Sequence, residues 1–304
     1  FIHAETAGMA KTRASGGSAA NTIHGLAHLG IKTGFIGKVG DDDMGKFFKK
    51  DMQVNKIKPI LFRSMNETGR AMALISKDSE RTFATYLGAA VDLSVEDISQ
   101  DIFSGYDYFY VEGYLVQDKA MFEKALRLAG KADLKICLDL SSYNVVAADV
   151  DFFKSMISEY VEILFANEEE IRALTGMSPE AGARETSEIC DTVVIKLGAE
   201  GSLCVCNDEM TRIGVRPSNA IDTTGAGDLY AAGFIYGHMK GLSLEICGKM
   251  GAILSGRVIE LIGAKMDEAN WESLRREVTA LEDSAPERKE IWYPPNLRIL
   301  ITRS

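Results

Sequence analysis

Residues 222–228 (DTTGAGD) combine two carboxylates with a glycine-rich turn, and an apolar run that reads as a helix follows directly. A glycine-rich turn that opens a helix exposes several backbone N–H groups, which form a binding site for anions such as phosphate. Asp228 would lie in the first helical turn beside that site, where a carboxylate can accept a proton from a substrate hydroxyl. The alternative is that Asp228 only caps the helix.

The spacing of the glycines argues against two other nucleotide-binding motifs. The dinucleotide fingerprint GxGxxG needs a third glycine three positions after the second, but Tyr230 stands there and the next glycine is Gly233. No GxxxxGK[ST] pattern occurs in the sequence, which excludes a P-loop.

A second glycine motif lies at residues 15–21 (SGGSAAN), before a predicted helix that stops at Gly30. The adjacent Gly16 and Gly17 allow the backbone to approach a ligand with no side chain between, and Asn21 offers both a donor and an acceptor to hydroxyl groups. This combination suits a polyol. An ordinary loop, helix and C-cap would have the same pattern.

Two further motifs follow predicted strands. Asn167 and Glu170 share a helix face after the apolar run VEILFA, where a carboxylate can hold Mg²⁺ through water; a solvated acidic helix start is the alternative. Lys196, Gly198 and Gly201 belong to KLGAEGS, a strand and a two-glycine turn that could place backbone against a nucleotide, or be a plain β-turn.

Composition excludes several classes of partner and site. The formal net charge of -10 argues against nucleic acid and anionic membranes, and no apolar run approaches the ~18 to 20 residues of a membrane span. The five cysteines show no CxxC pair and His24 and His28 have no third ligand nearby, so neither a disulfide framework nor a zinc site is indicated. We therefore expect a cytoplasmic protein that acts on a small molecule.

The elements that must position these residues alternate between strand and helix, which predicts an α/β, doubly wound parallel sheet with helices on both faces. Ligands of such sheets bind at the carboxyl ends of the strands. The predicted strands cover residues 33–40, 106–113, 134–140 and 161–167, and the predicted helices cover residues 43–52, 118–130, 150–160, 168–176 and most of 226–281.

One interval breaks this alternation. Residues 59–86 read as strand, turn, strand, turn, strand, which predicts a small antiparallel sheet inserted as a lid; an ordinary edge meander is the alternative. The predicted α/β core therefore comprises residues 1–58 and 87–290. Residues 291–304 are apolar but carry two prolines, and we assign them only as a C-terminal tail.

The four motifs, in their order along the chain, resemble those of the ribokinase-like (PfkB) family of carbohydrate kinases. The resemblance extends from about Ser15 to Leu281. GGSAANTIHGLAHLG with GFIGKVGDDDMG is similar to that family's first signature, and DTTGAGDLYAAGF to its second. The resemblance implies a Rossmann-like three-layer αβα sandwich with a β-sheet lid. It also implies ATP-dependent phosphorylation of a hydroxyl, with Mg²⁺, and a monovalent cation as a further candidate, in a monomer or homodimer.

The resemblance also assigns roles to individual residues. Asp228 matches the catalytic base, and Gly225, Ala226 and Gly227 match the anion hole. Glu170 matches the Mg²⁺ residue, and Gly16, Gly17 and Asn21 match the contacts to substrate hydroxyls. The ATP site is matched by Asn167, Thr223, Lys196, Gly198 and Gly201.

Within the family, residues 85–90 (TYLGAA) and 112–115 (EGYL) look more like the adenosine-kinase branch. An apolar wall of Leu87, Ala89, Tyr114 and Leu115 suits a flat base better than a free sugar. We therefore favour adenosine as acceptor, with a ribokinase- or fructokinase-like sugar kinase as the alternative. An oxidoreductase lacks support from the glycine spacing, and a non-catalytic nucleotide-binding protein would have no need of Asp228.

The start of the sequence departs from the family pattern. Members usually open with a strand and a lid segment that supply a substrate-binding carboxylate, whereas 15 residues precede Gly16 here and the first residue is Phe1. We expect some tens of residues before Phe1 that complete the sheet and the lid.

Overall fold

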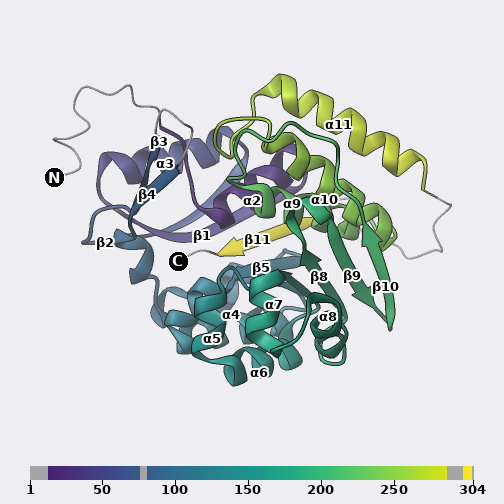
Figure 1. The fold of residues 1–304 in the computed structure, drawn as a ribbon. Coiled ribbons are helices and arrows are strands. Elements are labelled where there is room, and N and C mark those ends of the chain that lie inside the picture. The colour runs from purple at the N-terminus through teal and green to yellow at the C-terminus, as the bar shows by residue number, and fades with distance from the viewer. Residues whose placement is uncertain (1–12, 76–80, 286–296, 303–304) are drawn as a thin grey trace.

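The computed structural model describes residues 13–75, 81–285 and 297–302. Within these residues a nine-stranded sheet runs through the molecule in the order β10-β9-β8-β7-β6-β5-β11-β1-β2 (Figure 1). In this order, all neighbouring strands from β8 to β2 are parallel. Strand β9 is antiparallel to both of its neighbours, β8 and β10. The strands are β1 (Lys32–Gly40), β2 (Ile57–Ser64), β5 (Tyr108–Glu112), β6 (Lys135–Asp139), β7 (Ile163–Asn167), β8 (Thr192–Lys196), β9 (Ser202–Cys206), β10 (Glu209–Ile213) and β11 (Arg298–Thr302).

Helices cover both faces of this sheet, which confirms the predicted α/β class (Figure 1). One face carries α2 (Ser18–His28), α9 (Ala226–Met239), α10 (Leu244–Val258) and α11 (Glu268–Asp283), with α3 (Asp43–Val54) at the side of β2. The other face carries α4 (Lys119–Lys131), α5 (Tyr143–Ala148), α6 (Val150–Tyr160), α7 (Glu168–Thr175) and α8 (Pro179–Ser187). No helix among the described residues is long and apolar enough to cross a bilayer.

The two cores form because successive side chains of a strand point to opposite faces. In β5, Tyr108 and Tyr110 pack with the α2 and α9 side, while Phe109 and Val111 pack with the α4 side. Helix α9 lacks a polar face because it lies between the sheet, α2 and α10, and nearly all its side chains are buried. Its N-terminus therefore has a fixed position.

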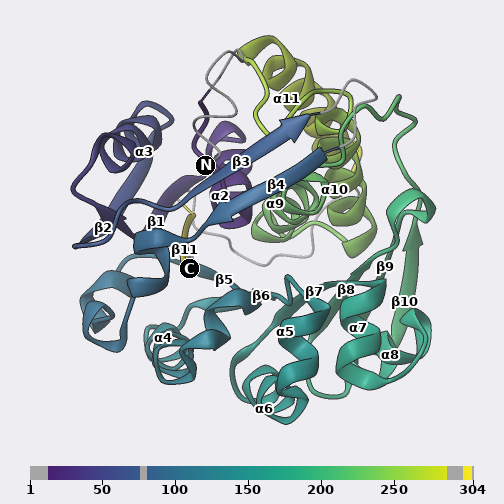
Figure 2. The same ribbon diagram turned by 60° about the vertical axis from the view of Figure 1, so that its left-hand side comes forward.

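The predicted lid is only partly antiparallel sheet. Strands β3 (Arg70–Ile75) and β4 (Arg81–Tyr86) form a separate two-stranded antiparallel hairpin (Figure 2). The first predicted lid strand, at 59–64, instead belongs to β2, which pairs in parallel with β1 at the edge of the main sheet. An edge strand tolerates Pro59, which lacks an N–H donor, so the sequence pattern could not distinguish the two partners. The predicted turn at 77–80 lies outside the described residues.

Strand β11 gives part of the C-terminal tail a place in the centre of the sheet. It lies between β5 and β1 and is parallel to both. Ile299, Leu300 and Ile301 are fully buried, with the two isoleucines facing the α2 and α9 side and Leu300 the opposite side. Burial on both faces explains why this strand is a continuous apolar run rather than an alternating one.

The position of β11 predicts that its side chains stabilise the whole fold. We expect Ile301→Ala to lower the free energy of unfolding by roughly 2 to 5 kcal/mol, because it removes buried methyl groups from a close-packed core. The matched control, Ile262→Ala, truncates an isoleucine that is 69% exposed and should change it by at most about 0.5 kcal/mol. Urea unfolding followed by circular dichroism measures both. Equal unfolding midpoints for the two variants would contradict the central position of β11.

Candidate functional site

Asp228 and Asn21, which come from two separate sequence motifs, meet at the N-terminus of α9. The Nδ2 of Asn21 donates to Oδ2 of Asp228 at 2.8 Å. Burial raises the pKa of Asp228, and the hydrogen bond from Asn21 opposes part of that increase. A carboxylate with increased proton affinity is a stronger base. The geometry therefore suits Asp228 to accept a proton from a group bound near Asn21.

The glycine turn before α9 has a tightly constrained shape. Gly225 is the N-cap of α9 with φ of 80°, and a β-carbon there would lie 2.5 Å from Cβ of Ala264. Only glycine fits both restraints. The N–H of Ala226 donates to the carbonyl of Thr223 at 3.1 Å, so that N–H serves the turn. Helix geometry directs the N–H groups of Gly227 and Asp228 out of the helix end.

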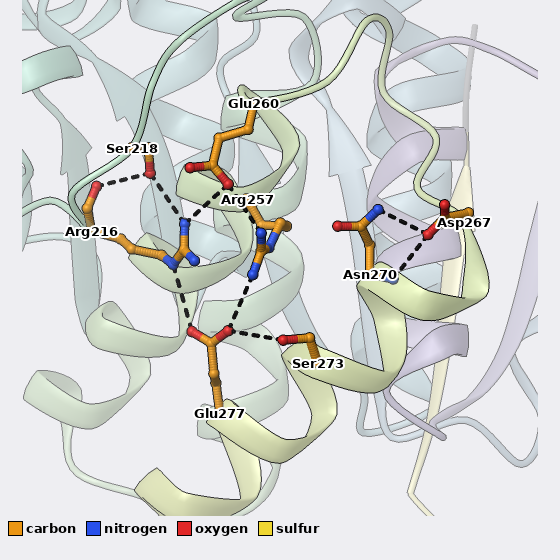
Figure 3. A network of polar contacts seen from close by, with 8 residues as sticks. All are labelled: Arg216, Ser218, Arg257, Glu260, Asp267, Asn270, Ser273 and Glu277. Atoms are coloured by element: carbon orange, nitrogen blue, oxygen red, sulfur yellow. Dashed lines mark hydrogen bonds and ion pairs between the residues drawn. The ribbon is translucent and has the colours of Figure 1, made fainter.

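The segment that leads into this turn is held by polar contacts. Asp222 accepts hydrogen bonds from the N–H groups of Thr224, at 3.0 Å, and Gly263. Further back, Arg216 forms ion pairs with Glu260 at 3.3 Å and with Glu277 at 3.5 Å (Figure 3).

A second arginine, Arg257, reaches the same two glutamates at 3.2 and 3.6 Å (Figure 3). Residues 216–224 are thus tied to α11 and to the segment between α10 and α11, which restricts where the N-terminus of α9 can lie.

Asn167 and Glu170 form a capping box at the start of α7. The backbone N–H and the side-chain Nδ2 of Asn167 each donate to a carboxylate oxygen of Glu170 at 2.8 Å. The backbone N–H of Glu170 donates to Oδ1 of Asn167 at 2.8 Å. Burial, followed by the charge of Asp139, raises the pKa of Glu170 to about 7, while Lys196 acts in the opposite direction. These two residues therefore have a structural role in addition to any role in binding.

Two buried carboxylates in this region were missed by the sequence analysis. Glu112 and Asp139 end the neighbouring strands β5 and β6, lie opposite each other in the register, and are 2% and 7% exposed. Asp139 Oδ2 pairs with Lys196 Nζ at 2.7 Å. Their positions at the carboxyl ends of parallel strands are the signal that could have identified them.

The carboxylates do not form a metal site by themselves. In the described part of the chain, no three His, Cys, Asp or Glu residues are grouped so that they could hold a metal ion. Glu170 nevertheless fits a divalent cation, because burial and then the charge of Asp139 raise its pKa, and a nearby positive charge would offset both effects. A Mg²⁺ ion there would take most of its ligands from water and phosphate oxygens.

The turn after β8 has the conformation expected of two glycines. Gly198 and Gly201 have φ of 55° and 91°. A β-carbon on Gly201 would lie 2.0 Å from the carbonyl oxygen of Ile213, so close packing alone requires glycine at this position. Lys196, the last residue of β8, is brought to the same edge of the sheet as Asn167.

A cavity of about 290 Å³ lies between the Gly16–Gly17 turn and the β3–β4 hairpin. The predicted acceptor wall is only partly in it. Leu87 lines this cavity, but Ala89 is fully buried and its neighbour Ala90 lines the cavity instead. Other lining residues that the sequence analysis missed are Phe47, Tyr86, Lys38 and Arg70.

Tyr114 and Leu115 lie apart from this wall. Leu115 is buried in the core on the α4 side. Burial raises the pKa of Tyr114, with contributions from the charges of Glu112 and Glu170, so its ring lies near the carboxylates at the strand ends. A local sequence pattern could not show that these two residues, which follow β5, turn away from the hairpin.

Ser15, directly before the glycine pair, is held by two residues from different helices. Its hydroxyl donates to Asp51 and lies 3.2 Å from Nε2 of His24, and His24 lies 3.2 Å from Asp51. Burial lowers the pKa of His24 to about 4, and the hydrogen bond from His24 lowers that of Asp51 to about 2. His24 thus anchors the turn that leads into Gly16 and Gly17.

A family model and a curated relative each match most of this chain. A model of the pfkB family of carbohydrate kinases matches residues 6–269. The 5-dehydro-2-deoxygluconokinase of Bacillus subtilis is 30% identical over 260 residues, which are 80% of this chain and 80% of that protein.

Two solved structures share this fold. Adenosine kinase from Sinorhizobium meliloti has a TM-score of 0.82 and 33% identity, and the match covers 91% of this chain and 87% of that one. A probable sugar kinase from Rhizobium etli has a TM-score of 0.83 and 30% identity, with 92% and 87% covered. The chain therefore belongs to the pfkB family of carbohydrate kinases.

Proposed function

We propose that the protein transfers the γ-phosphoryl group of ATP to a hydroxyl of a nucleoside or sugar, with Asp228 as the base. The observation that carries this proposal is the hydrogen bond between Asn21 and Asp228 at the N-terminus of α9. It joins the motif assigned to the acceptor and the motif assigned to the phosphoryl group within one hydrogen-bond length. A protein that only bound nucleotides would not require this contact.

In the proposed reaction, the acceptor oxygen forms a bond to the γ-phosphorus as the bond from that phosphorus to the β–γ bridging oxygen breaks. ADP leaves with the electron pair, and Asp228 takes the hydroxyl proton. The N–H groups at the start of α9 donate to the transferred phosphoryl oxygens, where they stabilise charge in the transition state. Mg²⁺, held near Glu170 through water, would neutralise part of the phosphate charge.

Adenosine is the first candidate acceptor. The cavity beside Gly16 and Gly17 is lined by Tyr86, Leu87 and Phe47, and aromatic and aliphatic side chains of this kind suit the flat face of a purine. The 33% identity to the adenosine kinase of Sinorhizobium meliloti supports the same choice.

A sugar acid is the second candidate, and basic residues in the same cavity favour it. Lys38 and Arg70 line the cavity, and each also has an acidic partner, Asp97 and Glu67 respectively. An acceptor carboxylate could share these cations. The identity to 5-dehydro-2-deoxygluconokinases supports this alternative.

The role of Asp228 is tested by Asp228→Asn. We expect kcat to fall by roughly 10²- to 10⁴-fold, because the amide cannot accept the proton, while ATP affinity changes little. Coupled ADP release measures kcat, and calorimetry measures ATP binding. Asp101→Asn, at an exposed aspartate outside the site, is the control. A kcat near that of the wild type in Asp228→Asn would refute the mechanism.

The role of Glu170 predicts a pH-dependent Mg²⁺ requirement. Because the pKa of Glu170 is raised to about 7, its carboxylate is mostly protonated at pH 6 and mostly ionised at pH 8. The free Mg²⁺ concentration for half-maximal rate should therefore increase about tenfold from pH 8 to pH 6. Glu170→Gln should need more Mg²⁺ at every pH and lose this dependence, whereas Glu168→Gln, at an exposed residue on the same helix, should behave as the wild type. An identical titration in Glu170→Gln would remove Glu170 from the metal site.

The acceptor is tested with a panel of adenosine, ribose, fructose and 5-dehydro-2-deoxygluconate under ATP-dependent phosphorylation. We expect the highest kcat/KM for adenosine. Leu87→Asp should reduce kcat/KM for adenosine more than for ribose, because a purine needs the apolar wall. A higher value for the sugar acid would select the second candidate, and a higher value for a free pentose or hexose would rule out both.

A further inference from the structure

The ion pair between Lys196 and Asp139 lies beside the N-terminus of α9. Lys196 ends β8 and Asp139 ends β6, so the pair spans the end of the intervening strand β7. Their side chains are only 17% and 10% exposed. Asp139 is held in turn by the Ser141 N–H at 3.0 Å and the Tyr110 hydroxyl at 3.4 Å. The carboxylate is therefore fixed independently of the lysine.

The ammonium group lies against the predicted anion hole. A β-carbon on Gly227 would be 3.4 Å from Nζ of Lys196, so the ammonium is in near-contact with the first turn of α9. The backbone N–H groups of that turn and the ammonium are therefore directed at the same space. An anion seated at the end of α9 would meet both kinds of donor.

Carboxylates from three further elements surround Lys196. Asp139 comes from β6, Glu170 from α7 and Asp228 from α9, and Glu112 of β5 lies opposite Asp139 in the sheet register. Burial disfavours the ammonium, but the charges of Asp139, Glu170 and Asp228 outweigh this effect and raise the pKa of Lys196. The lysine therefore stays charged throughout the pH range in which Asp228 can act as a base.

We infer that Lys196 contacts the oxygens of the transferred phosphoryl group and that Asp139 positions it there. The inference rests on the kinase reaction proposed above. It assigns to Lys196 the role of stabilising the negative charge that develops on the equatorial oxygens in the transition state. Lys196 keeps its proton, since Asp228 receives the proton of the acceptor. Asp139 touches no reactant; it acts by holding the ammonium beside Gly227.

The test compares Lys196→Met, Lys196→Arg, Asp139→Asn and the double variant Asp139→Asn/Lys196→Met with the wild type. We expect Lys196→Met to lower kcat by roughly 10²- to 10³-fold with little change in the KM of the acceptor, as for loss of one donor to transition-state charge. Lys196→Arg should recover part of this loss. Lys154→Met is the matched control, because it breaks the Lys154–Glu185 pair between α6 and α8, which plays no part in the site.

The pH profile of kcat distinguishes positioning from mere structural support. In Asp139→Asn, burial of Lys196 is no longer offset by the nearest carboxylate, so its pKa falls and the alkaline limb of the profile should move to lower pH. At saturating Mg²⁺ the double variant should be no slower than Lys196→Met, because Asp139 reaches the phosphoryl group only through the lysine. An unchanged alkaline limb or an additive double variant would overturn the role of Asp139.

Folding is controlled by circular dichroism of each variant. The double variant removes both charges together, so it avoids leaving a lone buried carboxylate if Lys196→Met alone unfolds. Lack of ATP-dependent phosphorylation by the wild type would refute the proposed function itself. A wild type that phosphorylates its acceptor, with kcat preserved in folded Lys196→Met or in the double variant, would refute only the role of Lys196.

Discussion

Electrostatic repulsion among carboxylates at one edge of the sheet is the constraint on which the site depends. Glu112, Asp139 and Glu170 are all nearly buried, and Asp228 lies close by at the end of α9. Buried carboxylates of like charge are costly unless a cation or hydrogen-bond donors compensate them. Lys196 compensates the negative charge of this group, and so do the dipole and the N–H groups at the N-terminus of α9.

This arrangement of charges would also favour binding of Mg²⁺ and of the phosphate groups. The pKa of Glu170 is raised because burial and the charge of Asp139 both disfavour its ionised form. A divalent cation that arrives with ATP would stabilise the ionised carboxylate. The phosphate groups would in turn satisfy the helix end and the ammonium group. The free protein therefore already carries the charges of the proposed nucleotide site, and reorganisation on binding can be small.

The sequence predicted the parts of the site that depend on local chain geometry. The glycine turn with Asp228 and the Asn167–Glu170 pair each lie at the start of a single helix, so their spacing is sufficient to recognise them. Asp139 could not be recognised in this way, because its partner Lys196 is brought to it only by the strand order β6-β7-β8. The same limit applies to Ala89 and Leu115, whose apolar character fits a cavity wall and a core equally well.

Strand β11 has a consequence for how the chain folds during synthesis. The sheet partners of β11 are β1 and β5, and the register joins Lys32 to Arg298, near opposite ends of the sequence. While the ribosome makes the intervening helices and strands, β1 and β5 have no common neighbour, and each exposes an apolar edge. The nascent chain must therefore keep these edges from pairing with other chains until β11 has emerged, and the centre of the sheet cannot close before then.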